Sequence, residues 1–455
     1  MTSRDTAQSY VTKSFLIDII TRDIGILDAI LELVDNSLDR VVEIHKIDVT
    51  KSLTEEYNFA SSLVLPEAIT ININISDDEF TIEDNCGGIT RADIEKEVFV
   101  FGLPKEGLKY TGLSAFGIGM KRAFFKLGRY VKLQTWAGEK DKTVIDWNID
   151  EWMKKRYEEK KGYEDWDIPF SDIKASELHF NYELPGTIIK IGKLNSSVKT
   201  RFGQTEFVTN LKNRLKASYA LFLKSGIKLI LNGEELSYAL PSFFTSEEIN
   251  YTSKYWKIED VDVRIIAGIT PFDDRVPRGW YVFCNGRMVL DGDKTQLTGW
   301  GTHLPLFHPK FNHFLGFVSF SSANVKILPW SSTKWGVELD SPVYMNALEE
   351  MRIQAIPILN FLDRWKDIKD DDESSVTALR ELLGEGKTTS VFASAKVETN
   401  FVFTNKKERP DVTKITFIKD RELVQRVKNA LGNPKMRNSS VGEMVFDYYV
   451  ESELD

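Results

Sequence analysis

Apolar residues recur every three or four positions between residues 24 and 44, and at every second position between Ile69 and Ile75. The first spacing predicts an amphipathic helix and the second predicts a half-buried strand, because these are the intervals at which side chains share a face. Further strand-like segments follow at 80–83, 130–136, 143–149 and 186–191, with a second helix at 120–127. This mixture predicts an α+β domain that ends near residue 197.

The remaining sequence predicts two further domains, because a single hydrophobic core rarely organises a chain of 455 residues. Helix-periodic segments at 206–224 and 342–365 flank strand-like pieces at 227–231, 261–269, 280–284 and 316–320. These elements predict a second α+β domain over residues 198–368. The acidic residues 370–373 indicate a linker, and we expect residues 369–455 to form that linker and a small C-terminal module.

Composition excludes several classes of protein. Hydrophobic residues make up 42% of the chain and charged residues 28%, which is too apolar for a disordered protein. The two cysteines, Cys86 and Cys284, cannot build a disulfide framework or a Cys-based zinc site. Because no stretch of about 18 apolar residues occurs and the N-terminus lacks a signal-peptide core, we expect a reducing, cytoplasmic location and no membrane contact. The net charge of −9 excludes a uniformly basic surface for nucleic acid.

The predicted helix at 24–44 carries a carboxylate and an amide on one face. Glu32 and Asn36 are four residues apart, so their side chains project from the same side. A carboxylate in that position can orient or deprotonate a water molecule, and the amide oxygen beside it can bind a hard cation such as Mg²⁺. The alternative for this segment alone is a solvated polar face.

A second segment suits recognition of an adenine ring. Asp84 ends a predicted strand and is followed by Gly87 and Gly88. The carboxylate can accept a hydrogen bond from the adenine amino group, and the glycines let the backbone approach a flat ring. Taken alone, such a string also fits an ordinary turn.

A third and a fourth segment suit phosphate binding and closure of the site. Gly117 and Gly119 stand immediately before a predicted helix, whose free N–H groups and dipole attract an anion. A bound phosphate would explain the cations Lys121 and Arg122 in the first helical turn, where they oppose the dipole; the alternative is a glycine-rich loop with ordinary surface cations. Further along, Gly186-Thr187 enters a strand.

In this order and spacing, the four segments resemble the GHKL superfamily of ATP-binding domains, which includes gyrase, the ninety-kilodalton heat-shock chaperones, histidine kinases and MutL-type mismatch-repair proteins. The resemblance implies a two-layer Bergerat sandwich over residues 1–197 that binds ATP and Mg²⁺. It implies that Glu32 is the general base, that Asn36 binds Mg²⁺, and that Asp84, Gly88 and Thr187 hold the adenine. The lid that holds the phosphates would contain Ser114, Phe116, Gly117, Ile118, Gly119, Met120 and Lys121.

The sequence departs from the family pattern at two positions. Cys86 stands where many members have the first glycine of an Asp-x-Gly-x-Gly motif, and Ser114 replaces the first glycine of the lid. We expect altered loop geometry there rather than loss of ATP binding. Asp35 and Asp39 also match family positions, and we expect them to be structural rather than catalytic.

The second domain is similar to the ribosomal-protein-like transducer domain of gyrase and MutL-type proteins. Residues 328–336 resemble the loop whose lysine reaches the terminal phosphate, which makes Lys334 the candidate sensor of that phosphate. The alternative is a surface lysine in an aromatic loop. Residues 282–289 resemble the Asn-Gly-Arg strand of MutL-type transducers, where we expect Arg287 to tie a turn. Related proteins dimerise when ATP binds, and residues 1–20 would take part in that exchange.

The C-terminal module contains a basic segment. Residues 406–437 hold ten Lys or Arg and four Asp or Glu. A solvated face and contact with DNA are the two alternatives, and only the latter weakens steeply with salt.

From these observations we expect an ATPase whose Mg-ATP cycle gates homodimerisation and domain rearrangement, closest in layout to MORC-type and MutL-type proteins and their bacterial relatives. Such families imply a DNA-related role, as in genome maintenance or anti-phage defence. The alternatives are a chaperone-like ATPase with a partner protein as client, and a nucleotide-gated scaffold that hydrolyses ATP negligibly.

Overall fold

The computed structural model divides the chain into two compact units, residues 1–404 and 405–455. It describes residues 10–45, 68–102, 112–113, 117–139, 141–157, 163–173, 183–247, 249–271, 276–367, 387–390, 398–403, 415 and 418–453.

An eight-stranded sheet organises the first half of unit 1. Its neighbouring strands are antiparallel except β1 and β7, which run parallel. In order across the sheet, the strands are β5 (Ser171–Asp172), β4 (Asp141–Asn148), β3 (Gly128–Gly138), β6 (Gly186–Leu194), β2 (Phe80–Asp84), β1 (Thr70–Ile75), β7 (Lys228–Leu231) and β8 (Glu234–Glu235).

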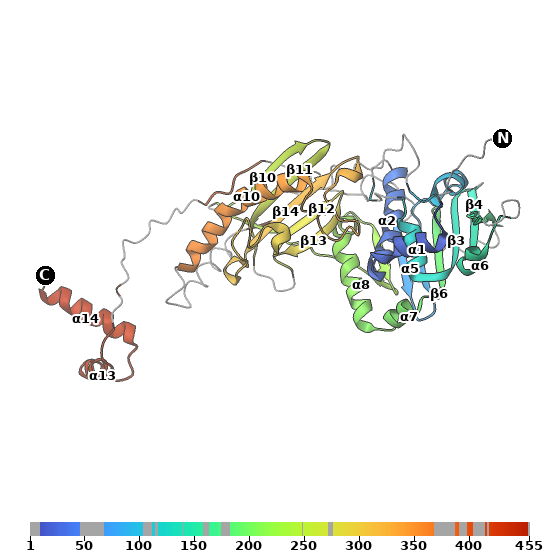
Figure 1. Ribbon diagram of the computed structural model, residues 1–455. Coiled ribbons are helices and arrows are strands. Elements are labelled where there is room, and N and C mark those ends of the chain that lie inside the picture. Colours follow the sequence, from blue (N-terminus) through green and yellow to red (C-terminus); the bar gives the residue numbers. More distant parts are fainter. Residues whose placement is uncertain are drawn as a thin grey trace, which may run out of the picture. The chain divides into compact units, whose positions relative to one another are not determined.

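Helices α1 (Lys13–Arg22), α2 (Ile26–Ile44) and α5 (Gly119–Leu127) lie together beside this sheet (Figure 1). The apolar stripe of α2 is buried, as its spacing predicts. Shorter helices follow the strands: α4 (Arg91–Asp93) runs into a π-helical turn at Ile94–Val98, and α6 (Ile149–Lys154) follows β4. A strand layer with helices packed over it is the two-layer sandwich that the sequence predicts.

A five-stranded sheet organises the second half of unit 1. Only β12 and β14 run parallel in it. In order, the strands are β10 (Thr252–Ile258), β11 (Val261–Ile269), β14 (Phe314–Ser321), β12 (Gly279–Cys284) and β13 (Arg287–Asp293). The long helix α10 (Pro342–Asp367) packs on β11 and β14. The α+β class is therefore confirmed.

Helices α7 (Ser196–Phe202), α8 (Thr205–Ser218) and α9 (Ala220–Lys224) lie between β6 and β7 along the chain, both of which are strands of the first sheet. Single 3₁₀ turns form at Gln296–Thr298, Pro309–Phe311 and Val325–Ile327, and β9 (Phe243–Thr245) pairs with β15 (Lys387–Thr389). The strands β7 and β8 follow residue 197 yet extend the first sheet. The three-domain division stays a prediction, and this pairing favours a first boundary after β8.

Unit 2 contains α13 (Arg421–Ala430) and α14 (Asn438–Glu453). The Asp420 carboxylate caps α13 by accepting from the backbone N–H groups of Glu422 and Leu423. Among the described residues of this unit only Val441 is a buried hydrophobic.

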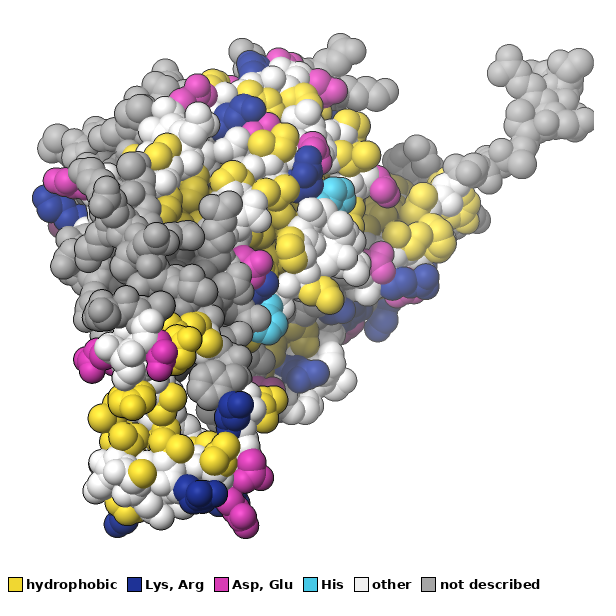
Figure 2. Space-filling model, turned by 90° about the vertical axis from the view of Figure 1, so that its left-hand side faces the viewer, with side chains coloured by type: hydrophobic (Ala, Val, Ile, Leu, Met, Phe, Trp, Pro, Cys, Tyr) yellow, Lys and Arg dark blue, Asp and Glu magenta, His cyan; other side chains and the backbone are white. Residues whose placement is uncertain are grey.

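On the face of the molecule drawn in Figure 2, Lys and Arg side chains are interspersed with Asp and Glu and with hydrophobic ones.

Candidate nucleotide-binding site

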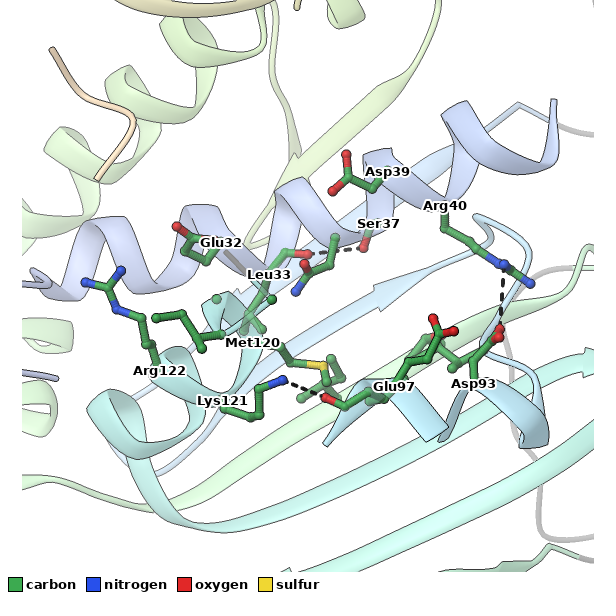
Figure 3. A pocket seen from close by; sticks show the side chains of 18 of the residues that line it. Glu32, Leu33, Ser37, Asp39, Arg40, Asp93, Glu97, Met120, Lys121 and Arg122 are labelled. Carbon is green, nitrogen blue, oxygen red and sulfur yellow. Dashed lines mark hydrogen bonds and ion pairs between the residues drawn. The ribbon is translucent and has the colours of Figure 1, made fainter. Parts of the chain in front are cut away.

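A pocket of about 310 Å³ lies between α2, the ends of β2 and β6, and the start of α5 (Figure 3). Its volume falls in the range of small-molecule sites. Every predicted site residue that the structure describes lines it: Glu32, Asn36, Asp84, Gly88, Gly117, Ile118, Gly119, Met120, Lys121, Thr187 and Lys334. The two others, Ser114 and Phe116, lie outside the described residues.

At one end of the pocket the Asp84 carboxylate is held by two donors. Its Oδ2 accepts from the Ser37 hydroxyl at 2.7 Å, and its Oδ1 accepts from the backbone N–H of Cys86 at 3.0 Å. Burial raises the pKa of Asp84, although both hydrogen bonds oppose that rise. Asp84 lines the pocket, so its carboxylate can accept from the amino group of a ligand.

Two glycines after Asp84 let the backbone turn beneath the pocket. Gly88 has φ +64°, and a Cβ there would lie 2.1 Å from the carbonyl oxygen of Trp136. Gly87 has φ +103°, and a Cβ there would lie 1.9 Å from Cδ1 of Ile44. Because no other residue type fits either position, these glycines are needed for the local shape. The substituted Cys86 is buried beside them.

Thr187 reaches this end of the pocket from the neighbouring strand. It pairs with Asp84 across β2 and β6, and its hydroxyl lies 3.2 Å from that of Thr135. The Thr135 hydroxyl also accepts from the backbone N–H of Ile89 at 2.7 Å. Two threonines thus link three neighbouring segments at the end that holds Asp84.

The start of α5 forms the opposite end. A Cβ on Gly119 would lie 2.2 Å from Oε2 of Glu32, so glycine alone lets this carboxylate approach the first turn of the helix. Gly117 has φ +65° and keeps the preceding chain in a left-handed turn. Free N–H groups at the start of this nine-residue helix can hold an anion.

The two cations in the first turn of α5 have protein partners. Lys121 donates from Nζ to the carbonyl oxygens of Val98 and Val100, at 2.9 and 2.7 Å. Arg122 donates from Nε to the carbonyl oxygen of Ile20 at 2.8 Å. Both side chains are buried, so the alternative of ordinary surface cations is wrong. A phosphate is therefore not required to explain either cation, although both line the pocket. Burial lowers the pKa of Lys121 to about 8.

Lys334 enters the pocket from a segment about 300 residues later than α2. Its Nζ donates to Oε2 of Glu32 at 3.1 Å and to Oδ2 of Asp35 at 2.8 Å. Lys334 is 1% exposed, so the alternative of a surface lysine is wrong. Burial opposes its charge, but the two carboxylates outweigh burial and raise its pKa. The two predicted catalytic residues are therefore in direct contact.

Asn36 fits a magnesium ion that is also held by a nucleotide. It lines the pocket one helical turn after Glu32 and offers an amide oxygen, a hard ligand. The described residues contain no group of three His, Cys, Asp or Glu that could hold a metal ion. Mg²⁺ commonly binds through one or two protein oxygens and the phosphates of its nucleotide, so this donor set suits it.

Comparison with protein families then shows where these features belong. Residues 25–178 match the family model of histidine kinase-, DNA gyrase B-, and HSP90-like ATPases. This part of the chain is a GHKL-type ATPase domain. Its family binds and hydrolyses ATP, and the pocket between α2, β2 and α5 lies where the GHKL motifs of the sequence converge. No curated protein matches the chain.

Sequence reasoning missed some residues of the GHKL pocket. Ser37 and Thr135 bind Asp84 and Thr187 through their hydroxyl groups, and Arg40 donates from Nε to the carbonyl oxygen of Gly88 at 2.8 Å. Arg40 is four residues after Asn36 on α2, so helical spacing is a signal that could have found it, whereas Ser37 is the next residue and lies off that face. Thr135 gave no such signal, because only strand pairing brings it next to Thr187.

Arg287 and Asp35, both of which we expected to be structural, form a buried ion pair. The Nη1 of Arg287 donates to Oδ2 of Asp35 at 2.8 Å, so this arginine contacts α2 in addition to following the turn where we expected it. The GHKL helix α2 is thus linked to the second sheet by ion pairs.

Among the described residues no helix is long and apolar enough to cross a membrane.

Proposed function

We propose that this protein hydrolyses ATP to ADP and phosphate in a Mg²⁺-dependent reaction. The observation that carries the proposal is the convergence of Glu32, Asn36, Asp84 and Lys334 on one pocket of the GHKL domain. Asp84 accepts from the adenine amino group, and Gly88 and Thr187 shape the space for the ring. Asn36 holds Mg²⁺, which would neutralise charge on the phosphates.

The reaction is attack of water on the terminal phosphate. Glu32 orients the water and takes its proton, and Lys334 holds the terminal phosphate. Backbone N–H groups of the lid from Gly117 to Lys121 stabilise the remaining phosphate oxygens. No covalent intermediate is needed, because phosphoryl transfer of this kind depends on positioning and electrostatic stabilisation.

The ATP cycle gates homodimerisation and movement between the two sheets, in the manner of MORC-type and MutL-type proteins. Ion pairs from Lys334 and from Arg287 of β13 to α2 support this coupling, since they link the end of the pocket at Glu32 to the second half of unit 1. Sedimentation with a non-hydrolysable ATP analogue tests it. A chain that stays monomeric at all analogue concentrations would contradict the dimerisation step.

A DNA-related role rests on the basic segment 406–437. Its described cations are Lys419, Arg421, Arg426, Lys428, Lys435 and Arg437; they belong to unit 2, where α14 carries only acidic charges. Turnover measured with and without DNA over a salt series tests this role, because binding to phosphates weakens steeply with salt. Stimulation by an unfolded protein but not by DNA would favour the chaperone-like alternative.

Replacement of Glu32 by Ala tests the hydrolysis itself. We expect turnover to fall by about 10³-fold, within the usual range for a lost general base, while ATP binding is retained. The control is Glu79→Ala, which removes an exposed carboxylate from the turn between β1 and β2. If wild type and both variants turn over ATP equally slowly and still change shape with ATP, the protein is a nucleotide-gated scaffold instead. The contact of Lys334 with Glu32 favours a low basal rate and keeps that alternative under test.

A further inference from the structure

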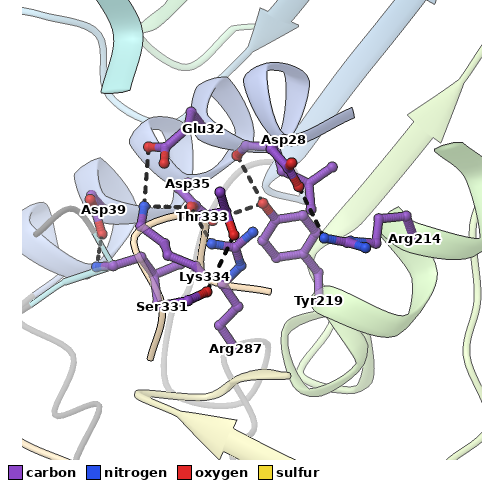
Figure 4. A network of polar contacts seen from close by, with 12 residues as sticks. Asp28, Glu32, Asp35, Asp39, Arg214, Tyr219, Arg287, Ser331, Thr333 and Lys334 are labelled. Atoms are coloured by element: carbon purple, nitrogen blue, oxygen red, sulfur yellow. Dashed lines mark hydrogen bonds and ion pairs between the residues drawn. The ribbon is translucent and has the colours of Figure 1, made fainter. Parts of the chain in front are cut away.

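One side of helix α2 is acidic along its length and meets cations from later segments of unit 1 (Figure 4). Asp28, Glu32, Asp35 and Asp39 are spaced four, three and four residues apart, which keeps them on one side. Their partners are Arg214 of α8 with Asp28 at 3.0 Å, Lys334 with Glu32 and Asp35, Arg287 of β13 with Asp35, and the backbone N–H of Leu113 with Asp39.

Asp35 is the centre of this arrangement. It is fully buried; its Oδ2 accepts from Lys334 and Arg287, each at 2.8 Å, and its Oδ1 accepts from the Tyr219 hydroxyl at 2.7 Å. Burial, reinforced by the charge of Asp35, raises the pKa of Tyr219 well above its ordinary value, so the hydroxyl remains a donor. Three donors in different directions fix this carboxylate in place.

Glu32 is held less firmly than Asp35. Among the contacts of described residues, its carboxylate has the 3.1 Å bond from Lys334 and packs against Gly119, and it lines the pocket. Lys334 therefore joins one fixed carboxylate and one that lines the pocket. Any phosphate that binds the ammonium competes with Glu32 rather than with Asp35, because Asp35 is enclosed by Arg287 and Tyr219.

The backbone also favours a fixed anchor for Lys334. Lys334 has φ +55°, a left-handed conformation that a residue with a side chain rarely adopts. The turn that holds it is closed by the N–H of Lys334, which donates to the carbonyl oxygen of Ser331 at 2.8 Å, and by the N–H of Ser331, which donates to that of Gly336 at 3.0 Å. Such strain persists where the surroundings over-determine it, and the buried ion pair with Asp35 is the strongest of those surroundings.

We propose that Asp35 is a positioning residue on which Lys334 pivots between Glu32 and the terminal phosphate of the nucleotide. Without nucleotide, Lys334 occupies the carboxylate of the general base. When it binds the phosphate, it keeps its bond to Asp35 and leaves Glu32 available to the attacking water. The inference rests on the proposed function. It adds that one lysine both binds the terminal phosphate and, in doing so, releases the carboxylate of the general base Glu32.

The test uses the full chain with Asp35→Asn, with Arg287→Met, and with both changes together. Asp35→Asn should lower kcat by about 10- to 100-fold, the usual effect of losing a residue that positions a reacting group, while the Kd for a fluorescent ATP analogue changes less than about threefold. The double variant restores the balance of buried charge and should regain thermal stability. It should not regain kcat, because its remaining ion pair is Lys334 with Glu32, which leaves the base covered.

Two further variants keep the test informative if Asp35→Asn folds poorly. Tyr219→Phe removes only one hydroxyl from the anchor and should lower kcat by about threefold with Kd unchanged. Asp28→Asn is the matched control, since it removes the outer carboxylate of the same helix side, and it should keep the wild-type kcat. A double variant with wild-type kcat would mean that Asp35 is merely structural, and a kcat for Asp35→Asn equal to that of Asp28→Asn would overturn the proposal.

These outcomes are distinguishable from failure of the proposed function. If the wild-type chain does not hydrolyse ATP, the function fails and no comparison among the variants arises. If the wild type is active and Glu32→Ala is inactive, the function stands, and the Asp35 series alone decides the pivot.

Discussion

The two ends of the nucleotide pocket are built in opposite ways. One end, here called the adenine end, takes Asp84 and Thr187 from neighbouring strands and is shaped by the backbone at Gly88. The phosphate end brings together charged side chains from distant segments, with Glu32 and Lys334 separated by 302 positions. The adenine end is therefore preformed by the first sheet, whereas the phosphate end is complete only when the second sheet is in place.

This difference separates affinity from turnover. A contact made by main chain and small hydroxyl groups changes little between states, so damage there should weaken binding without altering the chemical step. Buried charges that exchange partners can differ between states, so damage there should alter kcat. Substitutions at the two ends of the pocket test this division.

The largest effect is expected for Gly88→Ala at the adenine end. The left-handed φ of +64° and the 2.1 Å approach to the Trp136 carbonyl force the backbone to move. The combined strain is about 3 to 5 kcal/mol, so ATP affinity should fall by at least about 100-fold with kcat at saturation little changed. Gly138→Ala is the control, since a Cβ there meets no atom within 4 Å. Calorimetric titration that finds equal affinities would refute a backbone-shaped adenine end.

A smaller effect is expected for Asp84→Asn, which keeps the shape and removes the charge. The variant leaves the adenine amino group poorly matched, and ATP affinity should fall by about 1 to 3 kcal/mol. GTP offers a different edge and should lose far less. Asp78→Asn in the turn of the same hairpin is the control, because that side chain is exposed. Direct binding measured for both nucleotides decides it, and an equal loss for ATP and GTP would remove Asp84 from base recognition.

The smallest effect is expected at the phosphate end from Lys121 and pH. Burial lowers the pKa of Lys121 to about 8 from 10.5, so its positive charge is present below that pH and is lost as the pH rises through it. ATP affinity should therefore weaken by about threefold to tenfold between about pH 7 and pH 9, and Lys121→Met should abolish this dependence. Lys126→Met, on the same helix and outside the pocket lining, should retain it. A flat wild-type profile would contradict a role for the charge.

Much of the fold follows from local patterns. The spacing of apolar residues predicts α2 and β1 to within two residues of their observed ends, and it predicts β11 as observed. The pattern fails where an element is polar or broken. β10 is an edge strand rich in polar residues and was missed, and the helix predicted over 206–224 is two helices that meet at Tyr219.

The site shows the same division. Glycines with forced positions and the pair Glu32 and Asn36 can be read from spacing, because the local chain geometry alone sets where they project. The burial of Asp35 could not be read in this way. On an isolated helix Asp35 is an ordinary polar residue. Its burial is stable only because hydrogen bonds from Arg287, Tyr219 and Lys334 offset the cost of removing its charge from water.

The four short motifs, through their resemblance to the GHKL superfamily, predict a nucleotide pocket in the domain that contains residues 25–178, because each motif depends on short-range geometry. The contacts of Lys334 with Glu32, the predicted general base, and with Asp35 arise only in the folded chain. The physical reason is that ion pairs across hundreds of positions leave no periodic signal in sequence, and their strength depends on exclusion of water by the surrounding fold.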